Sequence, residues 1–444
     1  MLPRICFLLV FLVALPAFCQ VEPSAESGST AREDEMPMMT PPLVSGIAYP
    51  SVAGADVRSN YLVAGLTLNA GYTNNVFPAD TSTPLSDYTY IINPTFSYDR
   101  VAPRQHTTFA YNPGFSFYQP DSVLDSIDQS ASFRFEERLS PGAAFSVSDS
   151  FMRTSDVFNE SFPFPGGIGG TTQSPVPAVL APFAEQTANN AVAAISYQFG
   201  SNAMVGGGGG YSLYSFSTPN QSQGLYNSTG ESASAFYVGR FAGKQYVGLD
   251  YQYSRTVATP PNVWVDTQMQ TLLPFFAIYF SRSFSVSAAA GAQNTNVTQT
   301  SQPATGSWSP AVVASTGWQG PRTSLALSYQ RVITAGEGLG GAYRSSSVNV
   351  SGAWKISRSW DTGASAGYTT IDPALLLPGQ DYQGGSIFIA GVKLGHTIRE
   401  HFSADLGYDR LHENYGEIPA IAASPNTDRE YVTVTYKFTR PLGR

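Results

Sequence analysis

The chain has 444 residues, of which only 13% are charged while another 13% are aromatic. Scarce charge excludes an intrinsically disordered chain, and a mean hydropathy of −0.10 excludes a bundle of membrane-spanning helices. The formal net charge of −8 argues against a nucleic-acid partner.

Residues 1–19 are typical of a secretory signal peptide. Arg4 supplies a positive start, an apolar core begins at Cys6, and Ala-Phe-Cys precedes Gln20 as a cleavage site. The apolar run is too short for a transmembrane anchor. A lipoprotein reading of Cys19 is disfavoured because the bulky Phe18 precedes it. Both cysteines lie in this segment, so the predicted mature chain has no thiol or disulfide chemistry.

Residues 20–60 are polar, rich in proline and without periodicity. This composition favours a flexible leader in the periplasm, too short to be a folded plug. Residues 61–444 are expected to form a single β-barrel domain.

From Tyr61 onward the dominant period is two. In the stretch DYTYIINPTFSYDR, rings and aliphatic side chains alternate with polar ones, which indicates a strand with one apolar and one polar face. The pattern predicts strands near 61–75, 87–99, 106–119, 127–139, 143–155, 187–199, 203–217, 229–241, 244–258, 266–281, 283–297, 308–319, 323–335, 345–357, 359–371, 385–398, 401–415 and 428–439.

The connectors between these strands alternate between short and long, and the longest spans 156–186. Short turns with cations between rings, long loops and strands of membrane-crossing length are typical of an outer-membrane barrel. The sequence therefore predicts an all-β, antiparallel up-and-down transmembrane barrel of about 18 strands, within a range of 16–20. A soluble propeller is disfavoured because its blades need four short strands where this chain has two long ones.

Three prolines interrupt the predicted strands: Pro94, Pro113 and Pro274. Proline cannot donate to a β-ladder, so we expect lost ladder bonds there, with a β-bulge as one way to absorb them.

If the rings face lipid, the opposite face lines the interior, and a barrel of this size encloses water. Some long loops, 156–186 above all, are expected to fold inward. Arg134 and Glu136 lie two apart on one face, so they are expected to pair. The predicted pore-lining residues are Asn69, Asn93, Asp99, Arg134, Glu136, Asp250, Gln252, Lys393, Asp405, Asp409 and Lys437.

Catalytic motifs are missing from the sequence, so no enzyme activity, metal or cofactor is predicted. The chain has four histidines and none of the common hydrolase or zinc signatures. His412 beside Glu413 is the one pair we would test first. The run Gly206–Gly210 lacks the lysine and helix of a phosphate-binding loop, which favours a smooth strand.

The stretch LTLNAGYTNNVFPADT at 66–81, followed by NPTFSYDR and NPGFSFYQ, resembles the opening of the β-barrel porins often encoded beside bacterial exopolysaccharide-synthesis genes. The specific likeness covers about 55 residues, and no binding residues carry over from it. The resemblance implies an outer-membrane conduit, with polysaccharide as one cargo. A departure is the tail TRPLGR after Phe438, because such barrels commonly end on an aromatic residue.

Together these features predict a water-filled pore for passive or weakly selective passage of small polar solutes. It would lie in the outer membrane of a Gram-negative bacterium after signal cleavage. The alternatives are an exopolysaccharide exporter, a surface-exposed structural or adhesive barrel, and a barrel enzyme whose site is built from dispersed rim or loop residues. Expected partners are outer-membrane lipid and lipopolysaccharide, the barrel-assembly machinery, and polar solutes or polysaccharide.

Overall fold

The computed structural model describes most of the predicted barrel domain. The described ranges are 60–76, 86–120, 122–155, 185–216, 226–241, 243–260, 264–281, 283–300, 303–335, 341–375, 384–415 and 426–442. The predicted signal peptide, nearly all of the leader, and residues 156–184 of the longest loop lie outside them, so those predictions stay open.

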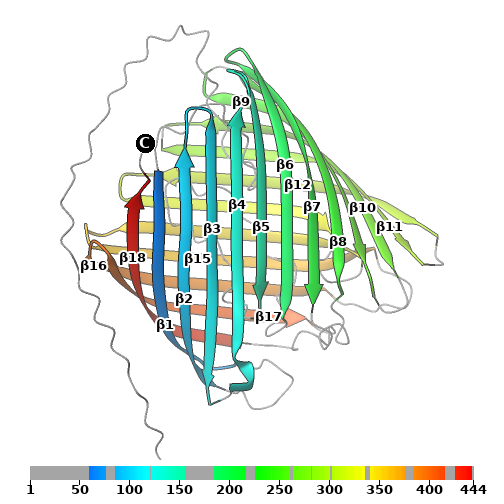
Figure 1. Ribbon diagram of the computed structural model, residues 1–444. Helices are drawn as coiled ribbons and strands as arrows, with labels where there is room; N and C mark the ends of the chain where they lie inside the picture. The colour runs from blue at the N-terminus through cyan, green and yellow to red at the C-terminus, as the bar shows by residue number, and fades with distance from the viewer. Residues whose placement is uncertain are drawn as a thin grey trace, which may run out of the picture. The chain divides into compact units, whose positions relative to one another are not determined.

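The chain forms one closed antiparallel barrel of 18 strands in up-and-down order (Figure 1). Closure comes from the ends of the sequence, since β1 pairs with both β2 and β18. The strands are β1 Asn60–Thr73, β2 Asp87–Val101, β3 Gln105–Gln119, β4 Ser126–Arg138, β5 Ala143–Thr154, β6 Gln186–Phe199, β7 Ala203–Phe216, β8 Ser228–Phe241, β9 Gln245–Ala258, β10 Val265–Tyr279, β11 Phe284–Gln299, β12 Thr305–Gln319, β13 Thr323–Thr334, β14 Ala342–Lys355, β15 Trp360–Leu375, β16 Gly385–Arg399, β17 Phe402–Tyr415 and β18 Asn426–Pro441.

The fold prediction is thus confirmed, including the strand number. β18 also includes half of the tail TRPLGR, because Thr439, Arg440 and Pro441 still pair with β1. A short 3-10 turn, Ser122–Leu124, is the one helical element of the described residues. No helix in this part of the chain is long and apolar enough to span a membrane.

The barrel has two unequal ends, as predicted. One end carries connectors of two to four residues, and the other carries connectors of five to 31 residues. We call these the short-turn end and the long-loop end.

Side-chain alternation gives the barrel an apolar outer face. Along β1, Leu66, Leu68 and Tyr72 are exposed on the outside, while Thr67 and Asn69 point inward and bond to β18. The same alternation runs round the wall and leaves dozens of rings and aliphatic side chains exposed outside. A soluble monomer rarely shows apolar patches of this extent, so the outer face requires an apolar environment.

Pro94 and Pro113 lie directly opposite each other on β2 and β3. The ladder is interrupted there, with pairing from Ile92–Phe115 on one side and Phe96–Tyr111 on the other. The register is the same on both sides, so the suggested bulge is wrong at this point. Two residues without N–H groups face each other, and the ladder loses its bonds at a single place.

Pro274 produces a similar gap between β10 and β11. Pairing stops at Leu272–Ala292 and resumes at Phe275–Ala289. Gly291 lies in the gap, and a Cβ built there would stand 1.8 Å from the carbonyl oxygen of Leu272. Only glycine allows the two backbones to approach this closely.

Candidate functional site

The inner face of the barrel is the candidate site, because a barrel of this size encloses a lumen that its inward side chains line. Strand register places every residue of the predicted lining on this face. The structure brings several of them together, but their role as pore lining stays a prediction.

A charged cluster occupies the inner face of β2–β4 near the short-turn end. The Arg134 guanidinium donates to Glu136 Oε1 from Nε at 2.8 Å and from Nη2 at 2.5 Å, so the predicted pair is confirmed. His106 Nε2 lies 3.0 Å from Asp99 Oδ1, and its Nδ1 lies 3.8 Å from Glu136 Oε2. Sequence reasoning missed His106, because its contacts depend on pairing between neighbouring strands.

A second group of charges lies on β15–β17. Asp361 and Asp405 converge over Gly395, whose absent Cβ would lie within 3.0 Å of both carboxylates. The stem of Lys393 lies over Gly363 on the neighbouring strand. Further toward the long-loop end, Asp409 on β17 stands opposite Arg429 on β18. Acids and bases therefore alternate on this part of the wall.

The inner face of β5–β8 is instead small and uncharged through its middle. Ser150, Asn190, Ser232 and Ser234 are exposed there. The run Gly206–Gly210 lies within β7, as predicted, and the Phe236 ring lies so close to Gly206 that a Cβ built there would stand 2.5 Å from it. This part of the wall is smooth and neutral, with hydroxyl and amide groups facing inward.

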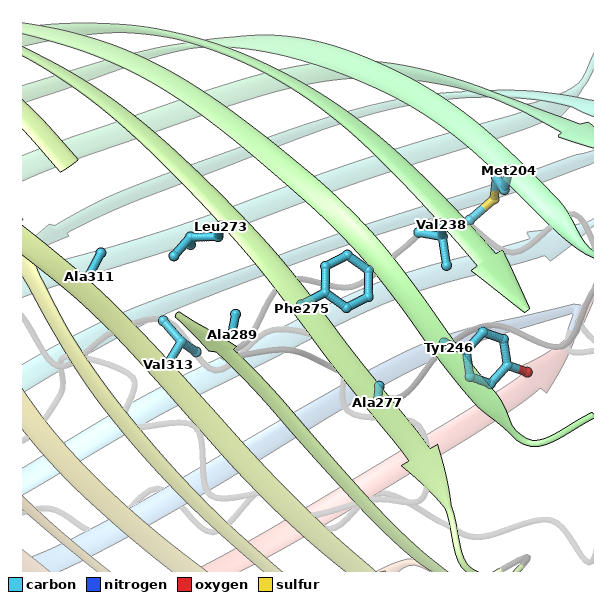
Figure 2. Close-up of a cluster of buried hydrophobic side chains, with 9 residues drawn as sticks. All are labelled: Met204, Val238, Tyr246, Leu273, Phe275, Ala277, Ala289, Ala311 and Val313. Atoms are coloured by element: carbon cyan, nitrogen blue, oxygen red, sulfur yellow. The ribbon is translucent and has the colours of Figure 1, made fainter. Parts of the chain in front are cut away.

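The inner face of β7–β12 departs from the expected polar lining. Met204, Val238, Tyr246, Leu273, Phe275, Ala277, Ala289, Ala311 and Val313 form a buried apolar cluster on neighbouring strands (Figure 2). Asp250 lies among these strands, opposite Leu273 and Phe236, and is only 5% exposed. Alternation alone does not reveal this cluster, because the period of two is blurred where both faces are apolar.

His412 and Glu413, the pair predicted as the first candidate for catalysis, do not come together in the structure. His412 points outward on β17 and contacts Asn426 Oδ1 at 2.7 Å, while the neighbouring Glu413 is buried on the inner face. Adjacent strand residues point to opposite faces, so the two side chains cannot act on one substrate atom. Within the described residues, no group of three histidine, cysteine or acidic side chains could hold a metal ion.

No protein-family model matches this sequence, and no curated protein matches it. Among solved structures, OccK2 (OpdF) of Pseudomonas aeruginosa is similar with a TM-score of 0.42 and 12% identity, covering 86% of this chain and 98% of that one. OpdK of the same organism has a TM-score of 0.40 and 12% identity, covering 85% and 99%. The FrpB iron transporter of Neisseria meningitidis has a TM-score of 0.41 and 11% identity, covering 87% and 82%. At these TM-scores the likenesses carry no functional argument, and the fold rests on the strand pairing itself.

Proposed function

We propose that this protein is an outer-membrane pore through which small polar solutes pass passively or with weak selectivity. The single observation that carries the proposal is the pair of faces on one closed wall. The outside is apolar all the way round, and the inside of β1–β6 and β14–β18 is polar. Closure of the barrel gives every strand two neighbours, so the backbone N–H and C=O groups can be hydrogen-bonded within the hydrocarbon layer. An open sheet edge there would cost several kcal/mol per unpaired group.

In this proposal the solutes travel along the polar arc of the inner face. The lining comprises nine of the predicted residues. The other two lie on β9 outside this arc: Gln252, and Asp250, whose burial leaves it out of reach. The outer face meets outer-membrane lipid and lipopolysaccharide, and insertion depends on the barrel-assembly machinery.

Purified protein reconstituted in a planar bilayer tests the pore directly. We expect stepwise conductance, together with a band whose gel migration changes on boiling, since a closed barrel resists detergent until heated. Protein that shows the heat-modifiable band yet passes no ions would contradict the pore while leaving the barrel intact.

The Arg134–Glu136 pair gives a sharper prediction about selectivity. Glu136→Gln removes a carboxylate but keeps the side chain's size, leaving Arg134 uncompensated on the inner face. We expect the cation-to-anion permeability ratio to fall by about twofold, because a net positive charge attracts anions into the path. The reversal potential in a salt gradient measures this. Glu137→Gln is the matched control, because Glu137 belongs to the outer face. An unchanged ratio in the Glu136 variant would place the pair outside the path.

Export of an exopolysaccharide is the second candidate function. The uncharged inner wall of β5–β8 favours it, because its exposed hydroxyl and amide groups suit a hydrated glycan and the glycine run of β7 adds no side chains to the wall. Block of the conductance by added neutral glycan chains, but not by single sugars, would favour the exporter over the simple pore.

A further inference from the structure

The hydrogen-bonded pairing between β12 and β13 is incomplete, and the boundary between these two strands is called the seam below. β12 and β13 pair only from Val312–Arg331 to Gln319–Ser324, although β12 begins seven residues earlier at Thr305. The other edge of β12 remains paired with β11 as far as Thr305. If the same register continued, Ala311 would pair with Val332, and Pro310 would then pair with Ile333. Pro310 has no N–H to contribute to such a pair. The wall therefore parts between β12 and β13 toward the long-loop end.

A side chain replaces the missing strand partner. Gln293 on β11 donates from Nε2 to the Ile333 carbonyl oxygen at 2.8 Å, and its Oε1 accepts from the Ile333 N–H at 2.7 Å. Both residues are buried, with Gln293 4% and Ile333 3% exposed. The carboxamide thus makes the two bonds that a backbone peptide would make, and it reaches past β12 to do so.

Beyond the last β12–β13 pair, β13 turns inward against the wall of β9–β11. β11 and β13 come into direct contact there, which next-nearest strands of a flat sheet do not. Ile333 of β13 and Ala342 of β14 belong by alternation to the outer faces of their strands, yet they pack on inner-face residues. The buried cluster between the two layers contains Ala258, Val265, Met269, Val297, Ile333 and Ala342. The wall overlaps itself at this corner.

We infer that this overlap is a lateral opening, latched by Gln293, through which an amphiphile with a single acyl chain passes between the interior and the surrounding lipid. This inference rests on the proposed membrane location and pore. Among the described residues, the side chains buried between the layers are mostly apolar, with the small hydroxyl groups of Thr267 and Thr295 beside them, and the Gln293 carboxamide is bonded to Ile333. Ions and sugars would lose their hydration there, whereas an acyl chain would not.

The overlap also connects two apolar surfaces. Val332, next to the latched residue, packs on the inner apolar cluster of β7–β12. On the outer face, Trp308 is 72% exposed. It lies in the part of β12 that pairs with β11 but not with β13. An acyl chain moving between the layers therefore stays in contact with apolar side chains along the way.

Movement of a fluorescent lysophosphatidylcholine across proteoliposome membranes tests the opening, with extraction by external albumin as the readout. Gln293→Met keeps the size of the side chain but loses both hydrogen bonds to Ile333, together with the weaker bond from Nε2 to Met269 Sδ. We expect lysolipid movement to rise at least about tenfold above wild type, because the closed state loses two buried hydrogen bonds. Gln330→Met, on the inner face of β13, is the matched control and should leave the rate unchanged.

A second variant closes the seam. Ala311→Cys with Val332→Cys places thiols at the next pair of the register, and no other cysteine exists in the described chain. Oxidation should reduce lysolipid movement to the protein-free rate, and reductant should restore it, while flux of a neutral sugar stays within about twofold. Lysolipid movement that neither Gln293→Met nor oxidation changes, in barrels that still pass sugar, would overturn the opening. If the wild-type protein passed no sugar at all, that result would instead overturn the proposed pore.

Discussion

We expect Ser232→Cys to react with a water-soluble, membrane-impermeant thiol reagent, and Ala233→Cys in the same strand not to react. Ser232 faces the interior and Ala233 faces outward, and both are exposed on their own side. In liposomes the inner thiol stands in water, and the outer thiol stands in lipid, where thiolate does not form. We expect reaction rates to differ by about 100-fold or more, since the thiolate is the reactive species.

Ser234→Cys and Ala235→Cys provide a second pair on β8 and repeat the test one step nearer the short-turn end. Labelling of the inner pair should also lower the conductance, because the attached group enters the path. Equal labelling of all four thiols in liposomes would mean that the outer face is not in lipid. Stronger labelling of the outer pair would mean that the assigned faces are reversed.

The second large effect concerns Gly291. Gly291→Ala puts a methyl group where a Cβ would stand 1.8 Å from the Leu272 carbonyl oxygen, and backbone cannot swing aside as a side chain can. The β10–β11 ladder, already interrupted at Pro274, must then separate further. We expect a loss of about 3 kcal/mol in the free energy of unfolding, at the upper end of overpacking costs.

Unfolding in urea, followed by the heat-modifiable gel shift, measures this loss. Gly317→Ala is the control, because the nearest atom to its added Cβ would be Ser285 Oγ at 3.7 Å, an ordinary contact. A Gly291→Ala barrel as stable as the Gly317→Ala barrel would show that the close approach of the two backbones can relax at little cost.

The sequence by itself determined the strand plan of this protein. Alternation along stretches such as 87–101 and 426–441 places rings on one face and polar groups on the other, so the strand number, the unequal ends and the inner position of Arg134 and Glu136 could be predicted. A period of two is a local property of the chain, and it fixes faces without reference to distant residues.

Only the tertiary structure decided which side chains on each face of the barrel contact one another. His106 joins Asp99 and Glu136 only because three strands align, and Pro94 faces Pro113 only through the register of β2 and β3. The apolar inner cluster around Asp250, and the corner where Gln293 bonds to Ile333, bring together residues that no local pattern relates. Alternation says which way a side chain points, but register and curvature of the closed sheet decide its neighbours.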